Sequence, residues 1–476
     1  MLTLLWMMAC KGEESPGNPT EPPAPAPAPA PVPTPVPTLP ADGIADFALT
    51  VDEEMVLLVH ATFTDPGSSE SWVEYRFEGE DWLVAPVIAP GEASILGVPA
   101  EVDVEARAAA VVDGATVYSP VVTAQTGPLP RALLAPDIAV HDVTLASPAP
   151  YAMISIATGD FTFSGPWWVE IVDRAGRVVW YQQVPDGLFS FSPTVARDGT
   201  HIWFEAEDIF GFASGEPHVT RQTLDRRWSV VLPVPELGQA IGEGPDDTFF
   251  YEYRTNSRHT VNQLDAAGAS TIVWDCDAHF DAIGVDSDEC SMNTTNWDPA
   301  RNTVLVSQFE TSTVFEVDLA TGVAVRQMGQ LEEGDPWTFE PADAMFAYQH
   351  FPNWTPEGTL IVSTHVPCMG APNCSANNGQ DGIQRAAEYL LDDVTKTITR
   401  IGMYESTDLW ATQAGEAYRL PNGNLVVGYG QDGAVREVTP AGAVAWEAQW
   451  PRGSGGYRVV GHLSLIDDLY TLNVGR

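Results

Sequence analysis

Residues 168–180 read WVEIVDRAGRVVW: a short apolar strand, an acidic residue, a tight turn at Gly176 and a second strand that closes on Trp180. Similar units recur along the chain, each with a variable gap. The six units lie within residues 168–180, 201–228, 249–274, 304–322, 360–392 and 424–446. A unit repeated about every 55 to 60 residues matches the four-stranded blade of a β-propeller. We therefore predict an all-β chain with a six-bladed β-propeller over residues 130–476, in which the repeated Trp, Asp and Gly residues pack between blades and form turns.

A different pattern precedes the repeats, in residues 42–128. Short runs alternate apolar and polar residues, as in WVEYRF at 72–77, and turn clusters such as DPGSS at 65–69 separate them. Short strands at this spacing predict a small β-sandwich. The end of the segment, with YSP at 118–120 and TGP at 126–128, resembles the last strand of a fibronectin type III domain. The resemblance implies a spacer or docking module rather than a catalytic domain.

The first residues have the features of an export signal. Residues 1–10, MLTLLWMMAC, form a short apolar run that ends in a small residue and Cys10, which we predict to be lipidated after export. Residues 11–41 are rich in proline and predict an extended linker. The alternative is a chance apolar start on a cytoplasmic protein. We expect an exported protein that a lipid anchor at Cys10 attaches to a membrane of the cell envelope, facing the periplasm or the cell surface.

The charge of the chain restricts its partners. The chain contains 22 Lys and Arg against 65 Asp and Glu, a formal net charge of -43, so its field repels nucleic acid. We predict no nucleic-acid partner. A site for an anionic substrate needs a local cation, which makes each Arg or His beside a pocket informative.

The cysteines after Cys10 are even in number, as expected for disulfides in an exported chain. They are Cys276, Cys290, Cys368 and Cys374, and we predict that sequence neighbours pair. The alternative, a zinc site, lacks the two-residue spacing of zinc motifs. We predict no metal and no cofactor.

Four passages in the predicted propeller are similar to one enzyme family. They are NTTNWDP at 293–299 with NTVLVS at 302–307, QH at 349–350 with PEGT at 356–359, RAAEY at 385–389, and GEAYRLPNGN at 415–424. In this shared order they resemble the bacterial arylsulfotransferase family over nearly all of residues 130–476. The resemblance implies transfer of a sulfuryl group from a phenolic sulfate to a phenol, without a nucleotide donor, through a sulfated histidine in the central channel.

Such chemistry needs a neutral imidazole as the nucleophile and cations that hold the sulfuryl oxygens. His350 and Arg385 match family residues that contact the sulfuryl group, and we predict both to be catalytic. Asn293 and Gln349 belong to the matched blocks, and we predict that they bind substrate. An arginine suits an oxyanion because its planar fork can grip two oxygens.

The chain also departs from the family pattern. The family's early histidine falls on Ser291, and residues 412–414 contain no match to its nucleophilic histidine. His365, beside the loop that Cys368 and Cys374 would close, is a candidate nucleophile. His279, inside the loop that Cys276 and Cys290 would close, is a candidate for substrate binding.

For each candidate histidine the alternative is a purely structural role. His462 is one of six other histidines for which we predict no function. A non-catalytic propeller lipoprotein that binds a ligand or protein partner therefore remains the alternative to the enzyme. A quinone-dependent propeller dehydrogenase is a third class, but the chain lacks the repeated tryptophan-docking signature of that class.

Overall fold

The computed structural model of this chain describes residues 43–157, 166–208, 215–365, 383–409, 411, 414–452 and 458–473. The predicted lipidation residue Cys10, the linker over 11–41, and the predicted pair Cys368 and Cys374 lie outside these residues. Among the described helices, none is long and apolar enough to cross a membrane.

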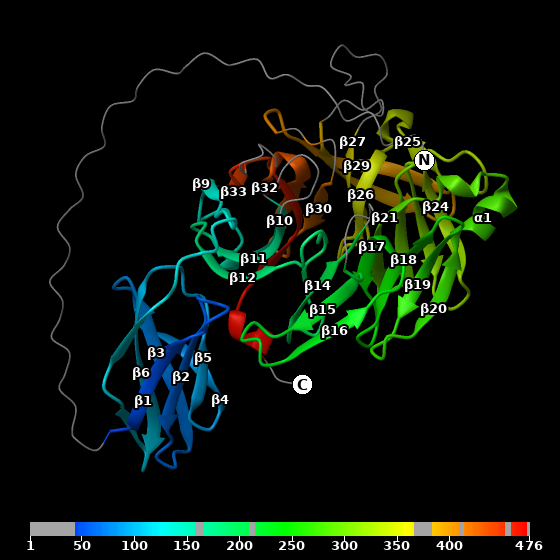
Figure 1. Ribbon diagram of the computed structural model, residues 1–476. Coiled ribbons are helices and arrows are strands. Elements are labelled where there is room, and N and C mark those ends of the chain that lie inside the picture. Colours follow the sequence, from blue (N-terminus) through cyan, green and yellow to red (C-terminus); the bar gives the residue numbers. More distant parts are fainter. Residues whose placement is uncertain are drawn as a thin grey trace.

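Six sheets, each built on four antiparallel strands, surround a common axis and form a β-propeller (Figure 1), which confirms the predicted fold. From the axis outward, the first blade contains β34 (Val459–Ile466), β10 (Tyr151–Ala157), β11 (Trp167–Asp173) and β12 (Val178–Gln183). The second contains β13 (Thr194–Val195), β14 (Ile202–Ala206), β15 (His218–Gln222) and β16 (Ser229–Pro233). The third contains β17 (Leu237–Glu243), β18 (Phe249–Thr255), β19 (Arg258–Leu264) and β20 (Ser270–Asp275).

The other three blades follow the same plan. The fourth contains β21 (Met292–Asp298), β22 (Thr303–Gln308), β23 (Thr313–Asp318) and β24 (Val323–Gly329). The fifth contains β26 (Ala347–Trp354), β27 (Leu360–His365), β28 (Arg385–Asp392) and β29 (Thr397–Glu405), with β25 (Thr338–Glu340) added in parallel outside β29. The sixth contains β30 (Glu416–Arg419), β31 (Leu425–Tyr429), β32 (Ala434–Val438) and β33 (Val444–Gln449).

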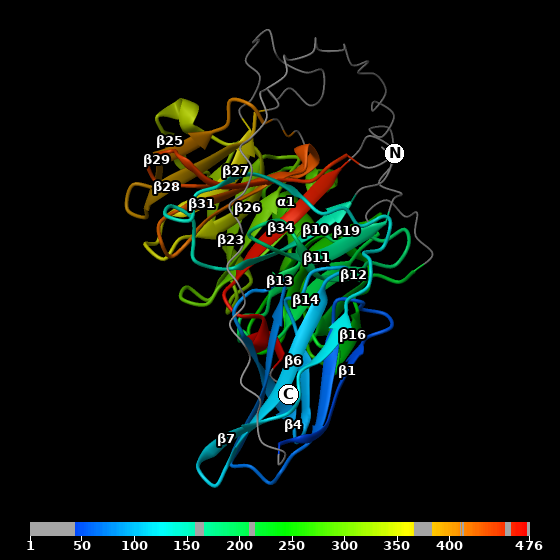
Figure 2. The same cartoon turned by 90° about the vertical axis from the view of Figure 1, so that its left-hand side faces the viewer.

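Two strands from opposite ends of the propeller sequence close the ring. The late strand β34 is the innermost strand of the first blade, where it pairs with β10 (Figure 2). The early strand β9 (Asp137–His141) is the outermost strand of the sixth blade, where it pairs with β33. An unpaired strand edge exposes a row of backbone donors and acceptors, so both pairings satisfy groups that an open ring would leave free.

Tryptophans at the ends of the repeats pack between blades. Trp180 and Trp446 are fully buried. The indole of Trp180 donates to the backbone oxygen of Leu224 in the next blade at 2.9 Å, and that of Trp446 donates to the backbone oxygen of Arg174 at 3.2 Å. Burial of a large ring that also satisfies its N–H explains why the repeats close on Trp.

The segment before the propeller forms a β-sandwich. Its strands are β1 (Ala45–Val51), β2 (Val59–Thr64), β3 (Glu70–Phe77), β4 (Leu83–Ala89), β5 (Glu92–Ile95), β6 (Asp103–Val112), β7 (Ala115–Tyr118) and β8 (Val122–Gln125). Their order is β1-β2-β5-β4-β3-β6-β7, with β8 also paired to β6. Val59, Val73 and Val104 from three of these strands meet in one buried core. The resemblance to a fibronectin type III domain stays a prediction.

The C-terminal segment packs the sandwich against the blades. The short 3-10 helix η4 (Leu469–Asn473) lies between the two parts, where Figure 1 draws it in red. Leu469 and Leu472 share one hydrophobic core with Leu57 and Leu96 of the sandwich and with the first blade.

The connection from β20 to β21 contains the α-helix α1 (Cys276–Ile283) and a disulfide. Cys276 and Cys290 are bonded at 2.02 Å, which confirms this predicted pair. Asp275 caps the helix, because its side chain accepts a hydrogen bond from the backbone of Ala278.

Candidate functional site

A small cavity on the propeller axis, here called the axial cavity, receives residues from every blade. Its lining consists of Phe191, Ser192, Gln239, Asn293, His350, Phe351, Ala414, Gly415 and Gly461. These residues lie on the innermost strands or directly before them. The cavity has a volume of about 20 Å³, enough for about one water-sized group. The predicted residues His350 and Asn293 therefore lie together in one cavity at the centre of the ring.

The innermost strands depart from regular pairing at the level of this cavity. On β21, Asn293 is an extra residue between the pairs Met292–Gln308 and Thr294–Ser307. On β34, Gly461 and His462 together lie opposite the single residue Ser155. Such β-bulges turn side chains out of the sheet and are common beside active sites.

His350 lies between two further irregularities, on β26. Its neighbours Tyr348 and Phe351 both have a φ of 48°, in the left-handed region that side chains other than glycine rarely adopt. Strain of this kind persists where the surrounding structure holds it in place, and it is concentrated at functional sites. The backbone therefore holds the His350 side chain at the axis from both sides.

The imidazole of His350 is a neutral acceptor. Its Nδ1 lies 3.2 Å from the backbone oxygen of Tyr348, and because a carbonyl oxygen can only accept, Nδ1 carries the hydrogen. Burial lowers the pKa of His350 to about 4, while the bond to Tyr348 opposes the shift. In the described part of the chain Nε2 has no hydrogen-bond partner. At neutral pH this nitrogen is a free, uncharged lone pair.

Asn293 and Gln349 have different surroundings. Asn293 donates through Nδ2 to the backbone oxygen of Gln349 at 2.8 Å, while its buried Oδ1 has no hydrogen-bond partner among the described residues. The amide of Gln349 donates to Ser307 and to the backbone oxygen of Gln308, both at 3.0 Å. Gln349 is fully buried and ties the fourth blade to the fifth, and it does not line the axial cavity.

Arg385 and His365 lie at the same end of the fifth blade but not in the lining of the axial cavity. Arg385 begins β28, and its Nε donates to a carboxylate oxygen of Glu405 at 2.6 Å. His365 ends β27 and is buried opposite Ala347 of β26. The role of Arg385 as an anion-binding residue stays a prediction, because Arg385 is not in the described lining of the axial cavity.

His279 lies in the helix α1, inside the loop closed by the disulfide. Its ring packs against Trp274 at 5.5 Å and Phe315 at 5.2 Å between centroids. Burial lowers its pKa. His279 is therefore packed among aromatic residues beside the fourth blade, away from the axial cavity.

Sequence reasoning missed a second histidine near the axis. Nδ1 of His462 lies 2.5 Å from Oε2 of Glu416 on the neighbouring innermost strand β30. The other carboxylate oxygen of Glu416 accepts the backbone N–H of Leu463 at 2.8 Å. The ring of His462 stacks on Phe351 at 5.2 Å, with 13° between the planes. The sequence did contain a signal for this histidine. Gly461 interrupts the apolar run VVGHLSLI at 459–466, and a glycine inside a strand suggests a β-bulge beside His462.

Buried glutamates on the second strands hold the backbone of the lining. Glu205 accepts the backbone N–H of Phe191 at 2.5 Å and that of Ser192 at 2.7 Å. Glu252 accepts the backbone N–H of Gln239 at 2.9 Å. Burial raises the pKa of both carboxyl groups. These side chains fix the cavity without entering it.

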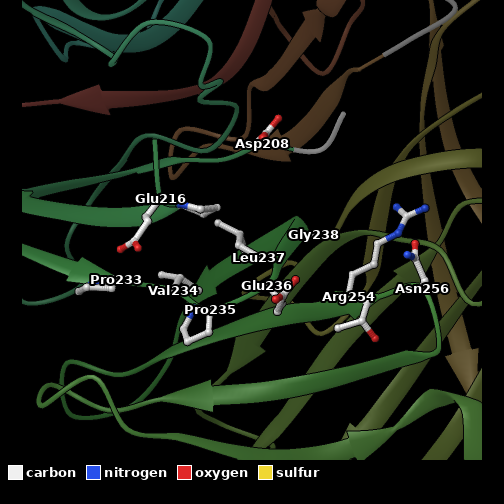
Figure 3. A pocket seen from close by; sticks show the side chains of 12 residues that line it. Asp208, Glu216, Pro233, Val234, Pro235, Glu236, Leu237, Gly238, Arg254 and Asn256 are labelled. Carbon is white, nitrogen blue, oxygen red and sulfur yellow. The ribbon is translucent and has the colours of Figure 1, made fainter. Parts of the chain in front are cut away.

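A larger groove of about 960 Å³ lies between the second and third blades (Figure 3). Arg254 and Asn256 lie at one end and Glu216 at the other, and prolines and Leu237 form much of the wall. Among the described residues, no three His, Cys, Asp or Glu side chains are placed to hold a metal ion.

Comparisons with known proteins show similarity of fold only. No family model matches the chain, and no curated protein matches it in sequence. A Bacteroides caccae protein of unknown function is 15% identical, with a TM-score of 0.40, over 65% of this chain and 97% of that chain. Hydrazine synthase of Kuenenia stuttgartiensis is 15% identical, with a TM-score of 0.36, over 58% and 74%. Virginiamycin B lyase of Staphylococcus aureus is 9% identical, with a TM-score of 0.35, over 70% and 100%. These similarities are too weak to assign an activity.

Proposed function

We propose that this propeller transfers a sulfuryl group from a phenolic sulfate to a phenol at the axial cavity, with His350 as the residue that receives the group. The observation that carries the proposal is the neutral imidazole of His350, which lines a cavity where all six blades meet and whose Nε2 has no partner among the described residues. A neutral imidazole is the form that can act as a nucleophile. The four passages similar to arylsulfotransferases support the same chemistry.

The reaction has two steps, and each conserves atoms and electrons. Nε2 of His350 attacks the sulfur of the aryl sulfate, a nitrogen–sulfur bond forms, and the phenolate leaves with the electron pair of the broken sulfur–oxygen bond. The oxygen of an acceptor phenol then attacks the same sulfur, the nitrogen–sulfur bond breaks, and its electron pair returns to Nε2. The acceptor loses its hydroxyl proton in this second step.

Polar groups of the lining would hold the sulfuryl oxygens. The hydroxyl of Ser192 and the amide of Gln239 are donors on neighbouring blades, and both line the cavity with His350. Donors aimed at developing negative charge stabilise a transition state more in a water-excluded site than in water. Arg385, which the family resemblance suggested for this role, is held by Glu405 and would have to leave that ion pair to reach the sulfuryl group.

The second candidate is a non-catalytic propeller lipoprotein that binds a ligand or protein partner. Two observations favour it. The axial cavity holds only about one water-sized group, and neither Arg nor Lys is part of its described lining. In that case His350 would be a buried structural residue with a free acceptor nitrogen.

The test is a sulfuryl-transfer assay on the full-length protein, with 4-nitrophenyl sulfate as donor and phenol as acceptor. We expect acceptor-dependent release of 4-nitrophenolate, and loss of at least about 100-fold in the His350→Gln variant, since the nucleophile is removed. His141→Gln is the matched control, because His141 is exposed on the outermost strand β9 and should leave the rate unchanged. Absence of release by the wild-type protein across several aryl sulfates would support the binding propeller instead.

A further inference from the structure

We infer that His462, held by Glu416, is the base that takes the proton of the acceptor phenol. The inference rests on the proposed function, because it assigns the proton that the second step of that reaction releases. His350 cannot take this proton while its Nε2 is bonded to sulfur. A second imidazole with a free nitrogen near the same cavity can act as the base for this proton.

The position of His462 follows from the bulge on β34. Gly461 lines the axial cavity, and His462 is the next residue. The imidazole of His462 stacks on Phe351, which lines the same cavity and directly follows His350. A side chain at Gly461 would collide with neighbours, because an added Cβ would lie 2.2 Å from Oγ of Ser155 and 2.5 Å from the backbone oxygen of Phe191. Glycine is therefore needed where the strand brings His462 to the axis.

Glu416 orients the ring. Its Oε1 is occupied by the backbone N–H of Leu463, so Oε2 faces Nδ1 of His462. A carboxylate accepts hydrogen bonds and does not donate them, so Nδ1 carries a hydrogen and Nε2 is left as the free basic nitrogen. The side chain of Glu416 is 2% exposed and that of His462 is 19% exposed. The orienting group is thus buried, while the imidazole keeps an accessible face.

The other groups packed on His462 do not compete for Nε2. The ring of Tyr418 lies 5.8 Å away between centroids, and its hydroxyl donates to the backbone oxygen of Leu463 at 2.7 Å. The backbone N–H of His462 donates to the oxygen of Phe191 at 2.6 Å. In the described part of the chain, Nε2 of His462 therefore has no hydrogen-bond partner and can accept a proton.

The proposed step accounts for the proton and for the electron pair of the broken bond. As the acceptor oxygen bonds to sulfur, its proton moves to Nε2 of His462, the nitrogen–sulfur bond to His350 breaks, and its electron pair returns to Nε2 of His350. The imidazolium of His462 then loses its proton to water. Proton transfer by a positioned base typically contributes about 10²- to 10⁴-fold to a rate.

The experiment separates the two steps by rapid mixing of the full-length protein with 4-nitrophenyl sulfate and phenol. His462→Gln should keep the first burst of 4-nitrophenolate, because the first step does not need the base. Its steady-state turnover should fall about 100-fold and recover in part with added imidazole. Glu416→Gln also tests whether the second step needs a basic Nε2, but it keeps the imidazole of His462. A Gln amide donates to Nδ1, so the hydrogen moves to Nε2 and the base is lost.

Each outcome has a distinct meaning. A variant of His462 that turns over like the wild type, with or without imidazole, overturns the assignment. Loss of the burst in His462→Gln, with an unchanged thermal midpoint and an intact burst in His141→Gln, also overturns it, because the first step would then need His462. A wild-type protein that shows neither burst nor turnover refutes the proposed function, and the role of His462 falls with it.

Discussion

Replacement of Glu170 by Gln should stabilise the protein, relative to wild type, as the pH rises from 4.5 to 7. Glu170 lies on β11 and is fully buried. One carboxyl oxygen accepts the indole N–H of Trp450 at 2.6 Å, while the other has no hydrogen-bond partner in the described part of the chain. Burial raises its pKa from 4.5 to about 8, only partly opposed by the bond to Trp450. The native protein therefore keeps this carboxyl group protonated at pH 7, whereas the unfolded chain ionises it.

The magnitude follows from this difference in proton binding. Because the native pKa is raised, the contribution of Glu170 to stability is full below pH 4.5 and declines as the pH rises towards 8. At pH 7 the decline spans about 2.5 pH units at 1.36 kcal/mol each, or about 3 kcal/mol. A Gln at this position accepts the same bond from Trp450 but does not ionise in the unfolded chain. Between pH 4.5 and pH 7, we expect the unfolding free energy of Glu170→Gln to rise by about 3 kcal/mol relative to that of wild type.

The assay is denaturant unfolding of both proteins at pH 4.5, 5.5 and 7, followed by circular dichroism. The matched control is Glu316→Gln. Glu316 is also fully buried, but it is paired with Arg326 and accepts a hydrogen bond from Thr303. Loss of its charge should destabilise the protein by about 2 kcal/mol. The comparison is the unfolding free energy of Glu170→Gln minus that of wild type. The prediction would be refuted if this difference stayed the same, or became smaller, between pH 4.5 and pH 7.

Two further predictions concern the cysteines. Cys276→Ser with Cys290→Ser should cost about 3 kcal/mol of unfolding free energy, because the bond closes a loop of sequence separation 14 and so restricts the unfolded chain. The thermal midpoint of wild type should fall in a reducing agent, and an unchanged midpoint would contradict this. Cys10→Ser should move the protein from the membrane fraction to the soluble fraction of cells, because we predict that Cys10 carries the lipid anchor. Equal membrane association of both forms would argue against lipidation.

Much of the fold could be predicted from local sequence. The strand, turn and Trp pattern around Gly176 repeats, and repeated units that cannot bury their faces alone stack into a ring. The pair Cys276 and Cys290 could be predicted because cysteines close in sequence pair readily. The closing strands β34 and β9 were not predicted, since their partners lie at the opposite end of the propeller sequence.

The candidate site could be predicted only in part. His350 and Asn293 were found because they lie in passages that resemble a known family, and both line the axial cavity. His462 was missed because its importance depends on Glu416, a residue 46 positions away on a neighbouring blade. Gln349 and Arg385 lie in equally similar passages, yet their side chains bond to Ser307 and Glu405. Resemblance locates a residue on a strand but does not decide which way its side chain points.

By itself, the sequence determined the class of structure: short strands, tight turns and six repeats, all set by contacts between residues close along the chain. Only the tertiary structure decided which side chains meet at the axis. Bulges at Asn293 and His462 and the left-handed backbone of Tyr348 and Phe351 arise where six blades press together. A bulge of one residue reverses the side to which a strand's side chains point, and distant strands set its position. For this reason the repeat could be predicted from the chain, whereas the centre of the ring required the fold.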